Sequence, residues 1–325
     1  MNFEQRIFQF IKDNRLIHPG GLVMAGFSGG ADSMALMQAL VALRHDLAIQ
    51  LHAVHFNHKM RPQAQDDERF VVQWCQRLNV PVTVGRRQGV KTTSLSEDGA
   101  RQMRFKFFIK HALRLKAHSV ALAHTRNDLA ETVLMRLMRG SGFYGLRGIL
   151  PHRSIEGVNF VRPLLGIGRA DVEEYLKLKK VPYCTDLTNQ QTKYTRNKVR
   201  LELLPLLARE YNPQIIGCLS DLGKTAGDDY EFLSSHAHRI FKKDVIISSE
   251  RVKITIKQMR LLHPAMRRLI IRLMAEALTR DPAVLNFEHI CAVEDLITHK
   301  SCSAVHLPHR LMMSKTKKFI ELSYA

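Results

Sequence analysis

LVMAGFSGGADSMALMQALVAL, residues 22–43, decides the fold of this 325-residue chain. Residues 22–27 form a short apolar run, which is typical of a buried parallel β-strand. Residues 32–43 carry apolar side chains at helical spacing. The polar turn between them holds two glycines, so the stretch predicts a strand, a tight turn and a helix.

The turn between strand and helix, Ser28 to Ser33, has the composition of a phosphate-binding loop. Paired glycines allow the backbone to turn sharply and to approach an anion, and the helix that follows presents its unpaired N–H groups. Asp32 could hold Mg²⁺ against phosphate oxygens, although it could also be a simple helix cap. The loop has neither G-x-x-x-x-G-K-S/T nor G-x-G-x-x-G, which argues against a Walker loop and a dinucleotide site. The candidate phosphate-binding residues are Ser28, Gly29, Gly30, Ala31, Asp32 and Ser33.

Strand-like and helix-like segments alternate after this unit. Strands are predicted at residues 49–56, 81–84 and 119–123, and helices at 63–78, 97–115 and 128–138. Such alternation implies right-handed crossovers and predicts an α/β fold, a doubly wound parallel sheet covered by helices on both faces.

The alternation of strand-like and helix-like segments ends at the glycines within residues 140–148, which mark a loop. Helices are predicted at 171–180 and 196–209, and we expect one domain over residues 1–212. A smaller, mostly helical domain is predicted for residues 213–325. The predicted segments of that domain are a long helical stretch from about residue 213, a β-like pair at 245–247 and 252–256, helices at 258–278 and 287–298, and terminal β-like segments ending at 322.

The charge of the chain is strongly positive. Lys and Arg number 49 against 30 Asp and Glu, a formal charge of +19, and residues 51–200 alone hold 27 basic and 12 acidic side chains. A surface this basic usually meets a polyanion, with nucleic acid as the first candidate, although a scattered and solvated excess is the simpler alternative. With 45% hydrophobic and 24% charged residues, the chain is not collagen-like, disordered or a small disulfide scaffold.

The five cysteines are isolated in the sequence, with no C-x-x-C pair. That spacing argues for a reducing compartment and against a disulfide framework or a tetrahedral zinc site. No apolar run approaches 18 residues and the N-terminus lacks a signal-peptide pattern, so we expect a cytoplasmic protein with no membrane segment.

Polar clusters follow two further predicted strands, HFNHKMR at 55–61 and HTRNDLAE at 124–131. Ligands of doubly wound sheets bind beyond the carboxyl ends of the strands, so we expect these clusters to converge with the glycine loop. In the second cluster, Asp128 and Glu131 share a helix face, where one could act as a base or orient a nucleophile, and His124 could contact phosphate or substrate. Favourable carboxylate placement at a helix N-terminus is the alternative for the acidic pair.

Two arginine sets complete the candidates. Arg101 and Arg104 share one helical face, and Arg196 and Arg200 lie close together further along the chain. Arginine clamps phosphates bidentately and stabilises charge in phosphoryl or nucleotidyl transfer, whereas a solvated helix face is the ordinary alternative.

Taken together, these segments resemble the PP-loop (N-type) ATP pyrophosphatases, with their adenine nucleotide alpha hydrolase-like fold, and within that superfamily the tRNA(Ile)-lysidine synthases. Where that family usually has H-H-x-D-D-Q-x-E-T, this sequence has Thr125, Asn127 and Leu129 at the second, fourth and sixth positions. The chain ends after what resembles the family's middle domain. The matching motifs are SGGADS (28–33), HFNHKMR (55–61), GARQMRF (99–105), AHTRNDLAETVLMRLMRGSG (123–142), RPLL (162–165), DLTN (186–189) and YTRNKVRLELLPLL (194–207).

The resemblance implies a ligase that joins lysine to C2 of the wobble cytidine of tRNA(Ile) with a CAU anticodon. ATP adenylates the cytidine and is converted to AMP and diphosphate; the product, lysidine, changes decoding from AUG to AUA. The implied partners are tRNA(Ile), free L-lysine and ATP, with Mg²⁺ as cofactor, no membrane, and a homodimer as an option.

The resemblance also implies roles for the candidate residues. The loop would cradle pyrophosphate, Asp32 would be the metal ligand, and Arg104 and Arg196 would stabilise the activated base or phosphates. A carboxylate would recognise or deprotonate the incoming ammonium. The implied catalytic residues are Asp32, Arg104, His124, Asp128, Glu131 and Arg196, and the implied tRNA- or substrate-binding residues are His58, Arg61, Arg101, Asn197 and Arg200.

Two alternatives stay open. A PP-loop tRNA sulfur transferase would use the same adenylation chemistry, but such enzymes typically need cysteine pairs, and here the cysteines are dispersed. A catalytically weakened, basic tRNA-binding protein of the same fold is the other.

Overall fold

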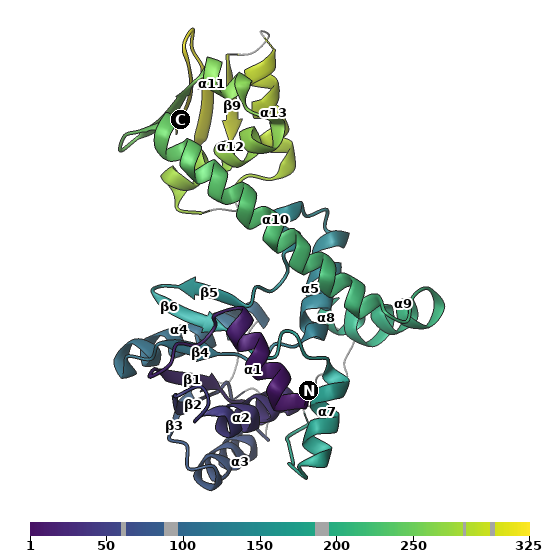
Figure 1. The fold of residues 1–325 in the computed structure, drawn as a ribbon. Helices are drawn as coiled ribbons and strands as arrows, with labels where there is room; N and C mark the ends of the chain where they lie inside the picture. The colour runs from purple at the N-terminus through teal and green to yellow at the C-terminus, as the bar shows by residue number, and fades with distance from the viewer. Residues whose placement is uncertain (60–62, 88–96, 186–194, 282–283, 300–302) are drawn as a thin grey trace. The chain divides into compact units, whose positions relative to one another are not determined.

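The computed structural model describes residues 1–59, 63–87, 97–185, 195–281, 284–299 and 303–325. The described chain divides into two compact units, residues 1–227 and 228–325 (Figure 1). The boundary predicted after residue 212 falls between helices α9 (Leu204–Glu210) and α10 (Ile215–Asp244). The first turns of α10 pack into the first unit through Leu219, which explains why the unit extends past that point. Among the described helices, none combines the length and apolar character needed to cross a membrane.

The first unit is built on a mixed, mainly parallel sheet. In the described residues this sheet has six strands in the order β3-β2-β1-β4-β6-β5, and only the edge strand β5 runs antiparallel to its neighbour. This arrangement confirms the predicted doubly wound parallel sheet and adds an antiparallel edge. The strands are β1 (Leu22–Gly26), β2 (Gln50–Asn57), β3 (Val82–Arg86), β4 (Ser119–Ala121), β5 (His152–Ile155) and β6 (Val158–Val161).

Helices cover both faces of this sheet because alternate strand residues point to opposite sides. On one face, Val23 and Ala25 of β1 share a core with α1, α2, α3 and α7. On the other, Met24 packs with α4 through Phe108. The helices of the unit are α1 (Phe3–Asp13), α2 (Ala31–Leu43), α3 (Ala64–Arg77), α4 (Glu97–Leu115), α5 (Arg126–Met138), α6 (Phe143–Leu146), α7 (Arg169–Leu178), α8 (Thr195–Lys198) and α9, with a π-helical turn at Val199–Leu203 between the last two.

Two parts of the first unit are absent from the sequence-based prediction. Helix α1 begins at a reciprocal Asn2–Gln5 capping box and buries Ile7 and Ile11 against the sheet. The β5–β6 hairpin adds two strands after the glycine-rich segment. Both are short elements whose position depends on distant packing partners, and local periodicity carries little information about those partners.

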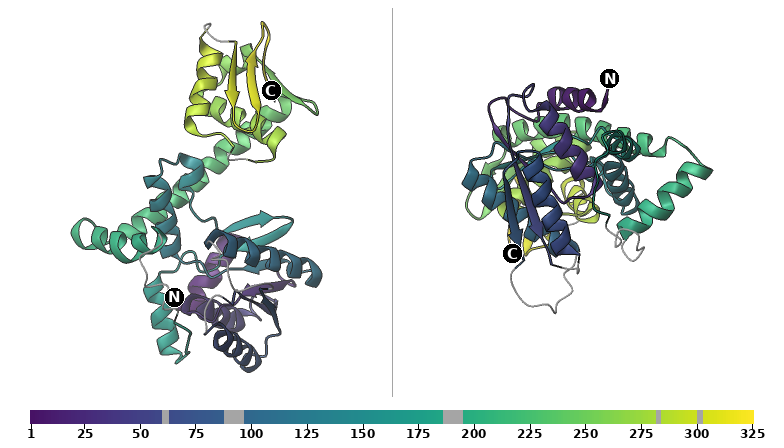
Figure 2. Two further views of the ribbon diagram at one scale, coloured as in Figure 1. Left: turned by 180° about the vertical axis from the view of Figure 1, so that it is seen from behind. Right: turned by 90° about the horizontal axis from the view of Figure 1, so that it is seen from below.

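The second unit contains a separate sheet. Its described strands follow the order β7-β8-β11-β10-β9, all antiparallel (Figure 2). The unit is largely helical, as predicted, and the β-like segments join in this one sheet. The strands are β7 (Ile246–Ile247), β8 (Arg251–Thr255), β9 (Ala304–Leu307), β10 (Leu311–Lys315) and β11 (Phe319–Tyr324).

The prediction of one continuous helix over residues 258–278 is wrong. The structure divides it into α11 (Ile256–Leu261) and α12 (Pro264–Thr279), followed by α13 (Phe287–Thr298). Pro264 starts α12 because a proline fits the first turn of a helix but interrupts its interior.

Candidate active site

The glycine loop closes on itself at the carboxyl end of β1. Gly29 has φ +85°, in the region that favours glycine, and its carbonyl accepts the Cys184 N–H at 2.9 Å. The Ser33 hydroxyl accepts the Ser28 N–H at 3.2 Å and donates to the Gly30 carbonyl at 2.9 Å. These bonds fix the turn, and the first N–H groups of α2 are left for a ligand, as at any helix N-terminus.

Asp32 lies in the first turn of α2 and is the one acidic residue of the Ser28–Ser33 loop. Its Oδ1 is buried and has no hydrogen-bond partner in the described structure. Burial, with a further contribution from the negative charge of Asp128, raises the pKa of Asp32 to about 6. A buried carboxylate oxygen with no partner suits a cation that arrives with the nucleotide.

The described ranges contain no group of three or more His, Cys, Asp or Glu side chains placed to hold a metal ion. A cation at Asp32 would therefore take its other ligands from phosphate oxygens and water. That is the usual coordination of Mg²⁺, which binds through one or two carboxylates together with substrate phosphates.

Two arginines and two carboxylates form a buried network beside the loop. Arg196 donates to Glu131 at 2.9 Å and to Asp128 at 3.2 Å. Arg200 donates to Glu131 at 2.6 Å and to Asp128 at 3.0 Å. The Glu131 side chain is 1% exposed, that of Asp128 13% and each arginine side chain 26%, so the acids lie deeper than the guanidinium groups, which remain partly open.

The start of α5 explains the position of this network. Thr125 is the helix cap, and its N–H and hydroxyl donate to Asp128 Oδ2 at 2.8 and 3.0 Å. Both oxygens of Asp128 are thus occupied, one by the cap and one by the arginines. Burial alone would raise the pKa of Asp128, but the charges of Arg196 and Arg200 and the hydrogen bond from the Thr125 backbone lower it, so Asp128 is ionised.

His124 lies just before this helix, after β4. Its Nδ1 is buried and has no hydrogen-bond partner among the described residues. Burial lowers the pKa of His124 to about 3, and the positive charge of Arg162 adds to this effect while Asp128 opposes it. The imidazole is therefore neutral at physiological pH.

A second cluster lies at the end of β2. His58 packs edge-on against Phe56, with 4.8 Å between ring centroids, and its Nδ1 is buried without a hydrogen-bond partner in the described structure. Burial and the nearby charge of Arg104 lower the pKa of His58 to about 4. Arg101 stacks over Phe105 at 5.1 Å from the ring centroid.

The structure places the predicted residues around the loop with the α5 network and around the β2 end with α4. These two parts adjoin, because the charge of Arg101 on α4 acts on His124 and the His55 Nδ1 lies 2.8 Å from the Phe27 carbonyl, just before the loop. Asn197 is half-buried on α8, next to Arg196. Arg61 and the predicted motif at 186–189 lie outside the described residues. Three residues near the site were not predicted to act there: Thr125, which caps α5, Arg169, whose charge acts on Asp32, and the buried Arg162.

Asn127 stands where the resemblance leads one to expect an aspartate, and the structure gives it a structural contact. Its side-chain oxygen accepts the Arg169 N–H at 3.0 Å, at the start of α7. We expect Asn127→Leu to lower the free energy of unfolding by about 1–2 kcal/mol, because it leaves this N–H without its partner. Asn127→Asp should stay within about 0.5 kcal/mol of wild type, since a carboxylate accepts the same bond and suits a helix N-terminus. Urea denaturation measures the free energy of unfolding of the two variants. Equal losses in both variants would contradict a structural role for the Asn127 hydrogen bond.

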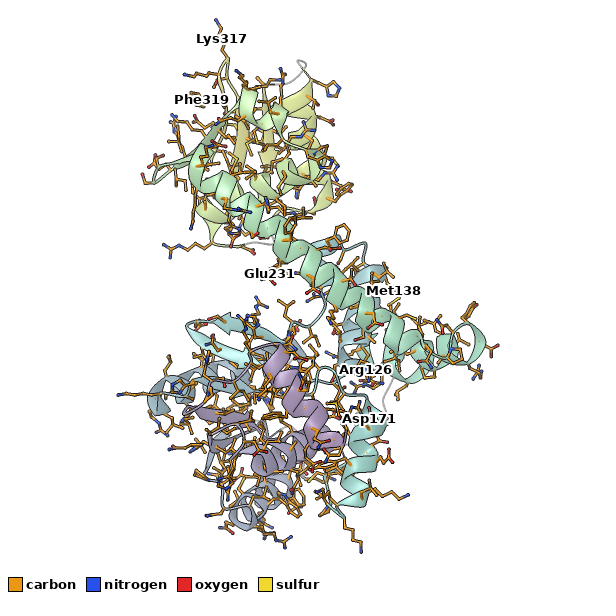
Figure 3. The ribbon with its side chains drawn as sticks, viewed as in Figure 1. Arg126, Met138, Asp171, Glu231, Lys317 and Phe319 are labelled. Atoms are coloured by element: carbon orange, nitrogen blue, oxygen red, sulfur yellow. The ribbon has the colours of Figure 1, made fainter. Side chains whose placement is uncertain are left out.

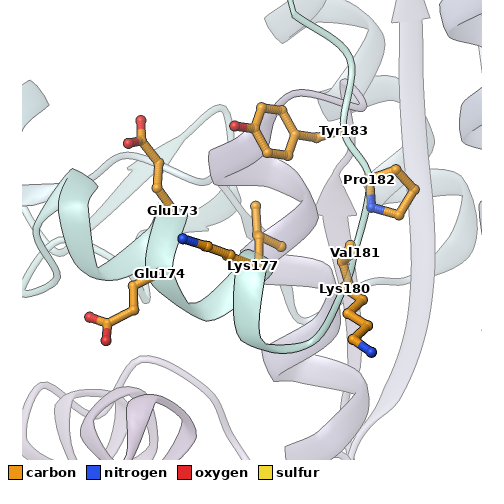
Figure 4. Close-up of a pocket in the computed structure, with 8 residues that line it drawn as sticks. Glu173, Glu174, Lys177, Lys180, Val181, Pro182 and Tyr183 are labelled. Atoms are coloured by element: carbon orange, nitrogen blue, oxygen red, sulfur yellow. The ribbon is translucent and has the colours of Figure 1, made fainter.

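A pocket of about 770 Å³ lies along the end of α7 and the segment after it (Figure 4). Acidic and basic side chains both line it, among them Glu173, Glu174, Lys177 and Lys180. Glu173 also contributes to the raised pKa of Asp32, and it pairs with Arg169 at 3.1 Å. The pocket is therefore close to the loop, and it is open and lined mainly by exposed side chains.

Comparison with known proteins identifies the chain. Residues 1–207 match the PP-loop domain family, so the fold and the loop define a PP-loop protein. Curated tRNA(Ile)-lysidine synthases are similar over almost the whole chain: 35% identity for Geobacter sulfurreducens, 30% for Caldanaerobacter subterraneus subsp. tengcongensis and 30% for Clostridioides difficile, covering 99%, 94% and 98% of this chain. The chain belongs to the tRNA(Ile)-lysidine synthase family of PP-loop proteins. It spans 68%, 66% and 70% of the length of these three relatives.

Among solved structures, the U34-tRNA thiolase NcsA from Methanococcus maripaludis, with its 4Fe–4S cluster, shares the fold. The TM-score is 0.56 at 16% sequence identity, over 68% of this chain and 78% of that one. Of the cysteines in the described chain, Cys75 lies on α3, Cys184 after α7, Cys218 on α10 and Cys291 on α13, and none of these forms a disulfide with another. At 16% identity, the likeness to the thiolase is one of fold.

Proposed function

We propose that this chain ligates L-lysine to C2 of the wobble cytidine of tRNA(Ile), with ATP converted to AMP and diphosphate. Membership of the lysidine synthase family supports this proposal. The observation that carries it is the position of the glycine loop and Asp32 beside the Asp128–Glu131–Arg196–Arg200 network, because Asp128 and Arg200 both act on the pKa of Asp32.

In the first step the cytidine O2 attacks the α-phosphate of ATP and diphosphate leaves. The loop N–H groups, with the Ser28 hydroxyl, would bind the leaving diphosphate, while the Ser33 hydroxyl holds the turn through its bond to the Gly30 carbonyl. Asp32 would hold Mg²⁺, which supplies positive charge for the phosphate oxygens when bound. The Asp32 Oδ1, which has no hydrogen-bond partner in the described structure, is available to such a cation.

Arg196 and Arg200 supply fixed positive charge. Their paired carboxylates hold the guanidinium groups in one orientation, so little reorganisation is needed as negative charge develops on the reacting phosphate. Asp128 and Glu131 therefore position arginines, and their occupied oxygens make them poor candidates for a general base.

In the second step the lysine ε-amine attacks C2 and AMP leaves. His124 would accept a hydrogen bond from the incoming amine through its imidazole, which is neutral because of its low pKa. A neutral acceptor suits an amine that must lose a proton, whereas a protonated imidazole would repel the ammonium form.

Basic residues of both units would bind the tRNA backbone. In the second unit, Lys253 and Lys318 lie over the Phe319 ring, at 5.0 and 5.5 Å from its centroid. Phe319 is labelled in Figure 3. On the catalytic unit, Arg101 is exposed at the start of α4. Phosphate contacts of this kind position the tRNA but carry no sequence information, so recognition of the wobble base would fall to the site itself.

The adenylation step tests the proposal. Purified protein should release diphosphate from ATP when a tRNA(Ile) transcript with a CAU anticodon is present, and lysine should not be needed for a single turnover. The matched control is the same transcript with uridine at the wobble position, which should give only background release. Tight tRNA binding without diphosphate release would favour a catalytically weakened tRNA-binding protein.

A further inference from the structure

Arg162 is a buried arginine that the proposed reaction steps leave unused. It follows β6, is 5% exposed, and its backbone N–H donates to the Pro151 carbonyl at 2.9 Å. The guanidinium donates a hydrogen bond from Nη1 to the Leu150 carbonyl at 2.7 Å. Its Nε is buried and has no hydrogen-bond partner in the described part of the chain.

The charges that act on Arg162 are positive. Burial, together with the positive charges of Arg101 and Arg153, lowers the pKa of Arg162 to about 10, and no acidic side chain of the described residues opposes this shift. Arg196 and Arg200, by contrast, are each paired with two carboxylates. Burying a guanidinium without an anion opposes folding, so a buried arginine of this kind needs a functional explanation.

Arg162 and His124 lie at the carboxyl ends of neighbouring parallel strands. Ala121 of β4 pairs with Val161 of β6, and the Leu122 N–H donates to the Val161 carbonyl at 2.9 Å. Both side chains thus follow paired strand ends, where ligands of such sheets bind. Both have a buried ring or guanidinium nitrogen without a partner in the described structure.

We propose that Arg162 binds the α-carboxylate of the lysine substrate, which leaves His124, at the end of the neighbouring strand, to the ε-amine. This inference rests on the proposed function. The planar guanidinium matches a carboxylate through parallel N–H···O bonds, and the depth of Arg162 suits a small free ligand better than a tRNA backbone phosphate.

The sheet order separates this subsite from the nucleotide phosphates. The glycine loop follows β1, β4 lies next to β1, and β6 lies beyond β4. The charges that act on Asp32 include Arg169 and Arg200, whereas Arg162 acts on His124. The amino acid would therefore lie on the β4–β6 side, with its ε-amine directed toward the reacting base.

The test compares L-lysine with L-lysinamide, which lacks the carboxylate, in wild type, Arg162→Gln and Arg162→Lys. Wild type should have a KM for lysinamide about 10- to 100-fold above that for lysine, because a charge-assisted pair is lost. Arg162→Gln should raise the KM for lysine by a similar factor and leave that for lysinamide unchanged. Arg162→Lys should recover part of the loss, and tRNA-dependent diphosphate release should stay at the wild-type rate.

The control variant is Arg153→Gln, which removes an exposed neighbouring arginine on β5 and should leave both KM values unchanged. Thermal melting of each variant reports folding, and the lysine–lysinamide comparison in wild type needs no variant. Equal KM values for lysine and lysinamide would overturn the proposal. A loss of diphosphate release in Arg162→Gln, with KM for lysine unchanged, would overturn it in favour of a phosphate contact.

Failure of the proposed function gives a different result. If the wild-type protein transfers no lysine to tRNA, calorimetric titration with L-lysine and with L-lysinamide decides the subsite alone. Tighter binding of lysine, lost in Arg162→Gln, supports it, and equal affinity rejects it.

Discussion

Replacing Asp32 by Asn should lower kcat for lysine transfer by about 10²- to 10³-fold, the usual cost of removing one group that stabilises transition-state charge. The reason is that Asn offers a neutral oxygen where a cation needs a carboxylate. Activity is measured as labelled lysine in tRNA at saturating ATP. Retained activity would contradict the metal role of Asp32.

The same substitution should stabilise the fold in the absence of ligands. Because the folded-state pKa of Asp32 is raised to about 6 from 3.8, ionisation costs stability as pH rises from about 4 to 6, and the full penalty remains above pH 6. Since one pKa unit corresponds to about 1.4 kcal/mol, Asp32→Asn removes a penalty on the order of 3 kcal/mol at neutral pH.

Urea denaturation in EDTA at pH 4 and pH 7.5 measures this difference. The advantage of Asp32→Asn over wild type should be small at pH 4 and large at pH 7.5, and other titrating groups cancel in the comparison. A variant that is less stable than wild type at pH 7.5 would show that Asp32 holds the fold together, contrary to the argument from its buried oxygen.

Glu131→Gln should destabilise the protein by about 3–5 kcal/mol, the cost of removing one member of a buried ion-pair network. Glu131 accepts from both Arg196 and Arg200 and is 1% exposed, so its loss leaves two guanidinium groups short of an anion. Lysine transfer should fall as well, because the arginines lose their fixed orientation.

A matched control for Glu131 is Glu210, which pairs with Arg209 at 2.7 Å on an exposed surface. Glu210→Gln should change the free energy of unfolding by less than about 1 kcal/mol, as exposed pairs do. Denaturation curves for both variants at one pH make the comparison. A loss below about 1 kcal/mol for Glu131→Gln would mean that the network does not position the arginines.

The strand–loop–helix unit could be predicted from sequence because its signals are local. The apolar run, the paired glycines and the helical spacing of residues 22–43 all lie within one segment, and the same holds for α4, whose bounds Glu97–Leu115 match the prediction. The rule that parallel strands end at one edge predicted the glycine loop near the Asp128–Glu131 pair, and in the structure the charge of Asp128 acts on Asp32 of the loop.

The rest of the site could not be predicted, because it depends on contacts between segments far apart in the chain. Arg200 lies 69 residues from Glu131, and no local pattern indicates that both oxygens of that acid would be occupied by arginines. The surroundings of Arg162 could not be predicted either, because the charges near it come from segments that only the folded chain brings together. Asp128 was a candidate base from its position alone, and its hydrogen bonds point to a positioning role instead.

The most direct test of the proposed function is mass spectrometry of the wobble nucleoside. A tRNA(Ile) transcript with a CAU anticodon is incubated with the protein, ATP, Mg²⁺ and L-lysine. The tRNA is then digested to nucleosides, which are separated and whose masses are measured. We predict that the wobble cytidine gains the mass of lysine less one water, and that omission of ATP abolishes the gain. An unmodified cytidine, with ATP consumed and tRNA bound, would contradict the proposed ligase activity.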